Sequence, residues 1–167
     1  YGKKAALDAA KPYQGGGNMI ADVRFERTLY HEAPQKFEAG TGSIADAVGL
    51  GAAIDYVSAI GMEAIAAYEQ ALLRYATEAL SRVPGLRFIG TAARKASVLS
   101  FVLEGHAIEQ VGKYLSDRGI AVRAGHHCAQ PILRHFGLEG TVRPSLAFYN
   151  TAREIDILAQ ALHELTR

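Results

Sequence analysis

The sequence of 167 residues contains one cysteine, no tryptophan and no long apolar run. A single cysteine excludes a disulfide within the chain and suits a reducing compartment, so we expect a cytoplasmic protein. Without about 20 consecutive apolar residues, no membrane span is expected. A secretory leader is not expected either, because no apolar segment follows Tyr1-Gly2-Lys3-Lys4.

Neither positive nor negative charge is in clear excess. The chain has 18 Lys and Arg against 17 Asp and Glu, a formal net charge of +1, and no basic stripe that would indicate nucleic-acid binding. Apolar residues make up 49% of the sequence, enough for a sizeable core. The length permits one domain, or a small domain with part of another. Because it opens without a start methionine or a helix cap, we expect the chain to be a piece of a longer protein.

The cysteine lies in the most distinctive stretch, Arg123 to Pro131, which also contains two adjacent histidines, an arginine and a glycine. The apolar run 119–122 predicts a short strand before it, and residues 129–136 predict a helix after it, with the proline in the first turn. A thiol on a glycine-containing loop lies where backbone can approach a ligand. The nearby imidazoles and guanidinium would favour the thiolate, which is the nucleophilic form.

Two other interpretations of Cys128 stand beside the nucleophile. A lone cysteine often behaves as a small buried apolar residue. His126 and His127 argue against that here, because buried imidazoles need hydrogen-bond partners. A metal site is the second alternative, but three consecutive residues do not readily converge on one ion, and no Cys-x-x-Cys or His-x-x-x-His pair supplements them. No metal ligand is predicted.

A second candidate site is Gly40-Thr41-Gly42-Ser43, directly before an apolar segment, 44–60. Ser43 can cap a helix over that segment, and hydroxyls with backbone amides at a helix start can bind phosphate. The same residues also serve as an ordinary turn with a cap. The helix would be apolar on nearly every side, which predicts burial between two domains or two subunits.

From residue 62 onward the pattern alternates between helical and strand periods, which predicts an α/β or α+β fold with helices covering one face of a sheet. Thr151 and Glu154 predict a capping box at the start of the last helix. Before residue 62, a short helix over 3–10 and edge strands at 19–23 and 27–30 are expected. The elements expected after it are helices at 62–83, 106–117, 129–136 and 151–165 and strands at 86–89, 97–103, 120–124 and 142–148.

The motif Arg123-x-Gly-His-His-Cys-Ala-x-Pro closely resembles the group II, SUF-type cysteine desulfurases, which are related to selenocysteine lyase. These are class V aminotransferases, members of the fold-type I pyridoxal-phosphate enzymes. Three further stretches agree in order: Gly15-Gly-Gly-x-Met19-Ile20, Phe37-Glu-Ala-Gly-Thr41 and Arg143-Pro-Ser-Leu-Ala-Phe-Tyr149-Asn150-Thr151. The resemblance extends over essentially the whole chain.

The resemblance implies a division of the chain and an assembly. Residues 1–43 would be the tail of a large cofactor-binding domain, 44–61 a connecting helix, and 62–167 the C-terminal small domain with a short, mostly antiparallel sheet. The complete protein would be a homodimer. The cofactor's anchoring lysine would precede this chain, so the chain alone is expected to be inactive.

The resemblance also implies the reaction. Cys128 would attack the sulfur of L-cysteine bound to pyridoxal phosphate, giving L-alanine and a persulfide that is passed to an acceptor protein for Fe–S cluster assembly. The cofactor serves as an electron sink, and the protein supplies a positioned thiolate. Selenocysteine as substrate, and a stand-alone persulfide-accepting module without catalysis, are the alternatives.

The remaining site residues follow from the same resemblance. Arg143 would bind the substrate carboxylate, for which a planar guanidinium is suited, with Arg123 and Asn150 as further substrate contacts. His126 and His127 would act in acid–base chemistry or line the pocket.

At the other candidate site, Thr41 and Gly40 would contact the cofactor phosphate of the other subunit. Gly42 replaces a proline that is common in the family at this position.

Overall fold

The computed structural model describes residues 2–167; Tyr1, the first residue of the stretch considered for a leader, lies outside them. Contacts divide the chain into an N-terminal unit ending at Ala59 and a C-terminal unit, Ile60–Arg167. The boundary lies close to the end of the expected connecting helix. The three-part division into 1–43, 44–61 and 62–167 stays a prediction.

The N-terminal unit contains the short helix and the two strands expected there. The strands pair antiparallel with each other, with an irregularity between Ile20 and Asp22. Within the described residues they form a two-stranded sheet of their own, and their expected place at the edge of a sheet whose main body lies elsewhere stays a prediction. The elements are α1 (Lys4–Ala9), β1 (Ile20–Val23), β2 (Thr28–Tyr30), the 3-10 helix η1 (Gln35–Phe37) and α2 (Ile44–Ile60).

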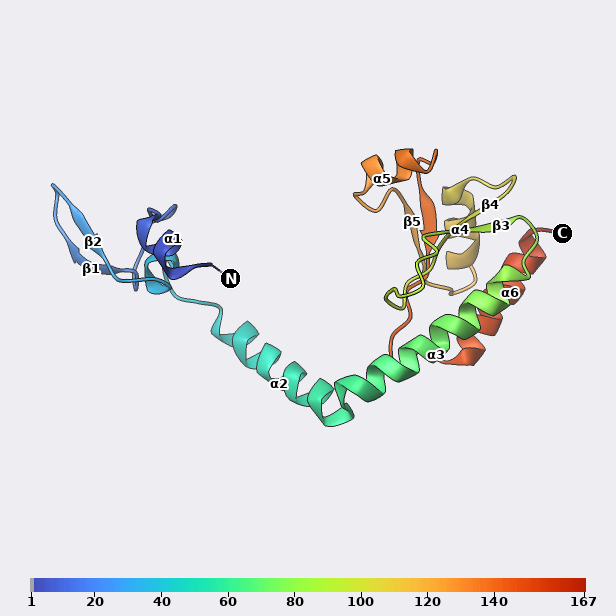
Figure 1. Cartoon of the computed structure of the whole chain (residues 1–167), viewed down its shortest axis with the longest axis horizontal. Helices are drawn as coiled ribbons and strands as arrows, with labels where there is room; N and C mark the ends of the chain where they lie inside the picture. Colours follow the sequence, from blue (N-terminus) through green and yellow to red (C-terminus); the bar gives the residue numbers. More distant parts are fainter. Residues whose placement is uncertain (1) are drawn as a thin grey trace. The chain divides into compact units, whose positions relative to one another are not determined.

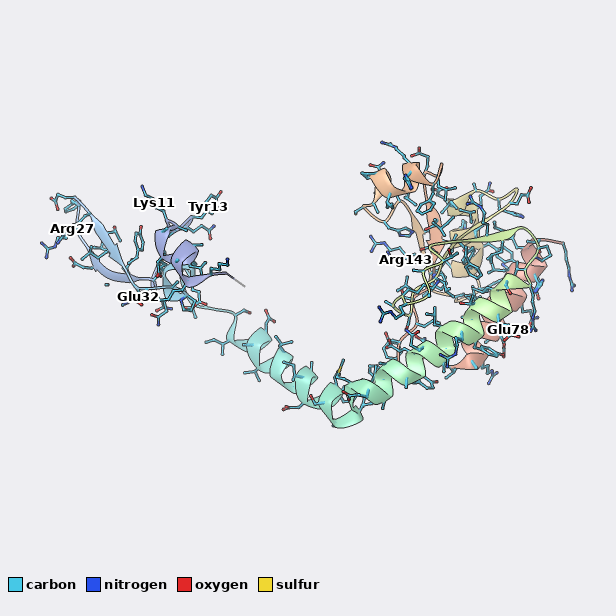
Figure 2. The ribbon with its side chains drawn as sticks, viewed as in Figure 1. Lys11, Tyr13, Arg27, Glu32, Glu78 and Arg143 are labelled. Atoms are coloured by element: carbon cyan, nitrogen blue, oxygen red, sulfur yellow. The ribbon has the colours of Figure 1, made fainter. Side chains whose placement is uncertain are left out.

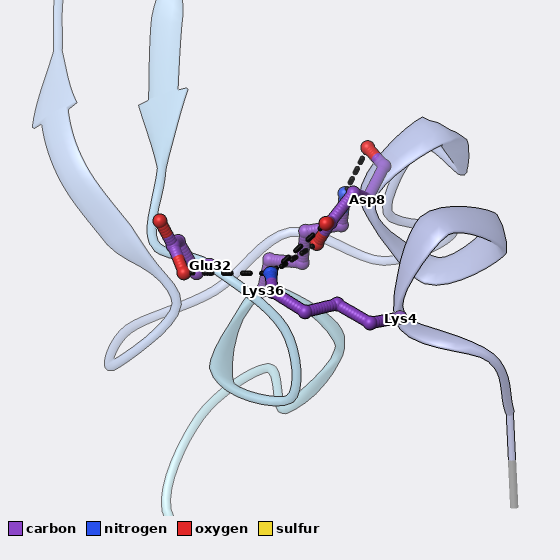
Figure 3. Close-up of polar contacts among 4 residues, drawn as sticks. All are labelled: Lys4, Asp8, Glu32 and Lys36. Carbon is purple, nitrogen blue, oxygen red and sulfur yellow. Dashed lines mark hydrogen bonds and ion pairs between the residues drawn. The ribbon is translucent and has the colours of Figure 1, made fainter.

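A small polar network joins α1 to η1 (Figure 3). Lys36 is buried, and its Nζ donates to the carbonyl oxygen of Asp8 at 2.9 Å. The Asp8 carboxylate pairs with Lys4 Nζ at 2.9 Å, and Lys4 also lies 3.6 Å from a Glu32 carboxylate oxygen. The lysine stem packs inside while its ammonium finds a carbonyl, which is how a lysine is accommodated in a small core.

Helix α2 has an exposed apolar surface. None of its residues is buried, and Ile44, Val48, Leu50 and Ile54 are exposed. The expected burial of this helix between two domains or two subunits stays a prediction. Apolar side chains still surround the helix, because the sequence gives it no polar face.

The C-terminal unit contains every helix and strand expected after residue 62, although three strands are shorter. Of these, the strand expected over 97–103 begins only at Ser100. The run 119–122 is not a strand, because the pairing with the neighbouring strand covers only Arg123–Gly125. The next expected strand, 142–148, ends at Arg143, where Pro144 lacks an N–H for the ladder. The elements are α3 (Met62–Ser81), β3 (Leu86–Ile89), β4 (Ser100–Leu103), α4 (Ile108–Ser116), β5 (Arg123–Gly125), α5 (Gln130–His135), β6 (Thr141–Arg143) and α6 (Ala152–Leu165).

The sheet has the order β3-β4-β6-β5, and every neighbouring pair is antiparallel. Phe101 and Val142 face each other across β4 and β6 and are fully buried in one core with residues of α3, α4 and α6. Figure 1 shows α3 and α6 side by side. The expected cover of three long helices on one face is confirmed, and residues 141 and 143 therefore face away from the core.

Helix α6 begins where the sequence predicts. The Thr151 hydroxyl accepts from the Glu154 N–H, and the Glu154 carboxylate accepts from the Thr151 N–H at 2.7 Å. These hydrogen bonds hold the pKa of the Glu154 carboxyl below its ordinary value. The capping box is confirmed.

Close packing of α4 on β5 gives a first testable expectation. A Cβ on Gly112 would lie 2.7 Å from Ala124 Cβ. Overpacking of this kind costs about 1–3 kcal/mol, whereas the gain in helix propensity from glycine to alanine is only about 1 kcal/mol. We expect Gly112→Ala to lower the free energy of unfolding by about 1 kcal/mol in urea titrations.

The matched control is Gly49→Ala in α2, where no described atom lies within 4 Å of the added Cβ. That variant should raise helicity without lowering stability. A Gly112→Ala chain as stable as the parent would show that α4 and β5 can separate at no cost.

Candidate functional site

The Cys128 loop runs from β5 to α5 in an unusual backbone conformation. His127 and Cys128 have φ values of 53° and 56°, so two successive side-chain-bearing residues adopt the left-handed region. The Cys128 N–H donates to His126 Nδ1 at 3.0 Å, and the Ala129 N–H donates to the His126 carbonyl at 2.9 Å. Cys128 is exposed, which excludes its interpretation as a small buried apolar residue.

His126 is held by this loop in a defined way. Its Nδ1 accepts the Cys128 N–H, so in the neutral ring the proton is on Nε2. The side chain is exposed. An exposed Nε2 is the atom of His126 that can exchange a proton with a ligand or with solvent.

His127 turns the other way, toward the sheet. Its Nε2 lies 3.0 Å from the carbonyl oxygen and 2.9 Å from the hydroxyl oxygen of Thr141 on β6. Burial of the ring lowers its pKa below the ordinary value, the Arg143 guanidinium lowers it further, and the Thr141 carbonyl partly offsets both. His127 is therefore favoured as a neutral ring that fastens the cysteine loop to β6.

The register of β5 and β6 sets two arginines against each other. Arg123 and Arg143 are directly opposed partners, as are Ala124 and Val142. Val142 faces the core, so both guanidinium groups leave the sheet on the other face, with Cβ atoms about 5 Å apart. Arg143 is labelled in Figure 2. Like charges directly opposed destabilise a sheet, and a bound anion such as a carboxylate removes that cost.

A cavity of about 200 Å³ lies on this face. It is lined by His127, Thr141 and Arg143 together with apolar residues that include Ile132 and Phe136 of the α5 region. The structure thus brings Arg143 and His127 together behind the cysteine loop. Thr141 was missed from sequence, although its place two residues before Arg143 on a strand puts it on the same face.

Asn150 is engaged elsewhere. Its Oδ1 accepts from the Ala147 N–H at 2.8 Å, and its carbonyl accepts from the Tyr68 hydroxyl at 2.8 Å. The side chain lines a different cavity, of about 350 Å³, between residues 118–122 and α6. These contacts stabilise the turn before α6, and a contact of Asn150 with substrate stays a prediction.

The second candidate site lies in the N-terminal unit. Gly40 has a φ of 84°, its N–H donates to the Gly17 carbonyl at 2.9 Å, and its carbonyl accepts from Asn18 Nδ2 at 3.1 Å. The triple-glycine loop therefore approaches its own chain, and a Cβ on Gly16 would lie 3.1 Å from the Gly40 nitrogen. Thr41 follows this fixed turn and is exposed.

The start of α2 is close to the prediction but differs in one contact. The Ser43 carbonyl accepts the Ala47 N–H at 3.0 Å, while its hydroxyl donates to the Asp46 carboxylate in the first turn. An exposed threonine hydroxyl beside a helix start fits a phosphate oxygen. The contact of Thr41 and Gly40 with a cofactor phosphate stays a prediction.

Across residues 2–167, no group of three or more His, Cys, Asp and Glu side chains is arranged to hold a metal ion. In the same residues, no single helix is both long and apolar enough to cross a membrane, and only α2 and α3 counted together across Gly61 reach that length.

The lowered pKa of His127 has a consequence for stability. The unfolded chain takes up a proton on this ring near pH 6.5 more readily than the folded chain does. Its contribution to the free energy of unfolding is therefore flat above about pH 6.5 and becomes increasingly unfavourable as the pH falls below that value. We expect His127→Gln to flatten the pH dependence of stability between about pH 7 and 5, measured by urea titration at a series of pH values.

The control for that experiment is His135→Gln, since His135 is an exposed histidine at the end of α5. It should leave the slope of stability against pH close to that of the parent chain. An unchanged slope in His127→Gln would mean that the ring is as easily protonated in the folded chain as in the unfolded one.

Comparison with known proteins places this geometry in a family. The model of the family described as Aminotransferase class-V matches residues 1–158. The chain belongs to the class V aminotransferase family. The resemblance seen in the Arg123 to Pro131 motif is thereby confirmed at the level of the family.

Within the class V aminotransferases the chain is similar to cysteine desulfurases. It is 67% identical over 165 residues to a cysteine desulfurase of Synechococcus elongatus, covering 99% of this chain and 26% of that protein. The cysteine desulfurase CsdA of Escherichia coli, solved as an S-sulfonic acid form, superposes with a TM-score of 0.91 at 36% identity, covering 99% of this chain and 41% of that one.

An apo cysteine desulfurase from Thermococcus onnurineus superposes with a TM-score of 0.93 at 35% identity, over 99% of this chain and 42% of the other. The expected fold, the C-terminal part of a fold-type I enzyme with an antiparallel sheet, is confirmed. The chain spans about a quarter to two fifths of the length of these class V relatives.

Proposed function

We propose that this chain is the C-terminal part of a pyridoxal-phosphate-dependent cysteine desulfurase, in which Cys128 receives sulfur from L-cysteine and L-alanine is released. The observation that carries the proposal is the opposed pair Arg123 and Arg143 beside an exposed cysteine. Two guanidinium groups on one sheet face favour the binding of an anionic group, and the substrate has a carboxylate. Similarity to cysteine desulfurases supports the same conclusion.

Within this proposal, each site residue of the C-terminal unit has one role. Arg143 binds the substrate carboxylate through paired N–H groups, and Arg123 adds positive charge beside it. That contact orients the substrate so that its sulfur faces Cys128. The Cys128 thiolate uses its electron pair to form the new S–S bond, and the electron pair of the breaking C–S bond remains with the substrate carbon, which takes up a proton to become alanine.

His126 is the candidate to move that proton or the thiol proton. Its Nδ1 is occupied by the Cys128 N–H, so transfer uses Nε2, the other nitrogen of this exposed residue. His127 instead holds the loop through Thr141. The two adjacent histidines therefore have separate roles.

Pyridoxal phosphate supplies the electron sink for cleavage of the C–S bond. The residues of this chain that would hold it are Thr41, through its exposed hydroxyl, and Gly40, through the turn that presents it. In the proposed homodimer this contact reaches the phosphate bound by the other subunit.

The sulfur on Cys128 is then passed to an acceptor protein for Fe–S cluster assembly in the cytoplasm. Exposure of the thiol on its loop supports this step, because a buried persulfide could not be reached by a protein thiol.

The testing experiment uses the full-length protein purified with pyridoxal phosphate, and the 167-residue chain in parallel. With L-cysteine, the full-length protein should form alanine and transferable sulfur in equal amounts, and the short chain should form neither. Preference for L-selenocysteine would make it a selenocysteine lyase. Sulfur uptake by the short chain from another persulfide protein, without alanine formation by the full-length one, would identify a persulfide-accepting module.

A further inference from the structure

His127 has one ring nitrogen fixed and the other unused. Its Nε2 lies within 3.0 Å of the Thr141 carbonyl oxygen, which can only accept, so Nε2 carries a proton. In the neutral ring Nδ1 is then a lone-pair acceptor. That atom is buried and has no hydrogen-bond partner among the described residues. A buried acceptor without a donor is unusual in a folded protein.

Arg143 has an unpaired donor that complements this unpaired acceptor. Its Nε–H is a buried donor without an acceptor, and His127 Nδ1 and Arg143 Nε are the two buried side-chain atoms of this kind among residues 2–167. Thr141 and Arg143 lie on the same face of β6, two residues apart. His127 and Arg143 line the same cavity of about 200 Å³. The residues that carry the unpaired donor and the unpaired acceptor thus line the same open cavity.

We propose that His127 positions Arg143 by accepting, through Nδ1, a hydrogen bond from Arg143 Nε–H that one cavity water relays. The water accepts from Nε–H and donates to Nδ1, which satisfies both buried atoms. A water occupies about 30 Å³ of liquid volume, so the cavity has room for it. The proposed contact follows from the two unpaired buried atoms, and its consequence for substrate binding rests on the proposed function.

The consequence is an oriented guanidinium. With Nε–H engaged behind it, Arg143 keeps its two terminal NH₂ groups for the two oxygens of a carboxylate. Thr141 fixes the ring and the ring fixes the arginine, so His127 acts on the substrate through Arg143. This explains why a histidine directly beside the cysteine turns away from it.

Protonation of His127 would undo the arrangement. Nδ1 would become a donor and could no longer accept the relayed bond. The groups whose positive charge disfavours protonation of the ring are Arg143 on β6, Arg123 on β5 and, whenever it carries a proton on both nitrogens, His126 on the loop. A protonated His127 ring therefore repels Arg143. Carboxylate binding should weaken as the pH falls, with the pH dependence of a single protonation.

Nitrogen NMR of the 167-residue chain tests the contact without enzyme activity. At pH 7.5 the His127 ring should be the Nε2-protonated neutral tautomer, and Arg143 Nε–H should exchange slowly with water. His127→Gln keeps an amide that can donate to Thr141 but removes Nδ1, so the Arg143 Nε–H should exchange at least about tenfold faster. An Nδ1-protonated tautomer, or unchanged exchange in the variant, would overturn the proposal.

Kinetics of the full-length protein test the consequence. His127→Gln should raise KM for L-cysteine about tenfold with kcat within about twofold, and should remove the acid-side rise of KM seen in the parent. His127→Asn places an amide oxygen near the former Nδ1 and should recover most of the KM. His135→Gln serves as the histidine control. If the parent makes no alanine, the proposed function fails while the NMR result stands; an active parent with unchanged KM in His127→Gln overturns the inference.

Discussion

Replacing Cys128 by alanine should reduce sulfur transfer from L-cysteine by about 1,000-fold or more in the full-length protein, because alanine has no thiol to act as nucleophile. The chain contains no second cysteine, and Cys128 is exposed on its loop. Pyridoxal phosphate should remain bound, since the residues proposed to hold it lie away from the Cys128 loop. Alanine and sulfide formation and the absorbance of the bound cofactor measure the two parts of this expectation.

Cys128→Ser is the matched control for size and loop conformation. Cys128 has a φ of 56°, and serine can adopt this conformation with the same side-chain branching as cysteine. Both variants should have parent-like stability and should lack the persulfide. Substantial sulfur transfer by either variant would show that the thiol is not the sulfur acceptor.

Replacing Arg143 by alanine should raise KM for L-cysteine by about 100-fold, equivalent to about 3 kcal/mol, which is the size expected for loss of a paired hydrogen bond to a charged group. The substitution also leaves Arg123 as the single guanidinium of the pair, opposite an alanine on β6. Steady-state kinetics over a range of L-cysteine concentrations measure the effect.

Arg143→Lys separates charge from geometry. Lysine keeps the positive charge but cannot present two N–H groups in one plane, so it should recover only part of the KM. The comparison variant is Arg118→Ala, since Arg118 lies over the Tyr114 ring, 3.6 Å from its centroid, and lines the other cavity. A parent-like KM for Arg143→Ala would mean that another group binds the carboxylate.

Local signals in the sequence predicted the α-helices, each to within two residues of its observed start. The capping box of Thr151 and Glu154 involves residues three apart, so its geometry is written into the sequence. Strand lengths were predicted less well. The run 119–122 has the composition of a strand, but a strand needs a partner, and the partner stops pairing at Arg143.

The candidate site likewise combines features predicted from local sequence with features set by tertiary contacts. The motif around Cys128 predicts an exposed thiol on a loop, and the structure agrees. The pairing of Arg123 with Arg143 joins residues 20 positions apart through the sheet register, and the contact of His127 with Thr141 spans 14. Tertiary contacts of this kind have no local signature. Lys36 is similar, because its burial depends on a carbonyl of α1 far away in the sequence.

Peptide mass spectrometry of the full-length protein shows whether Cys128 carries the transferred sulfur. After brief exposure to L-cysteine, the peptide containing Cys128 should gain the mass of one sulfur atom, and a thiol reductant should remove it. An unmodified Cys128 peptide in a protein that nevertheless produces alanine, or sulfur found on a different residue, would contradict the account.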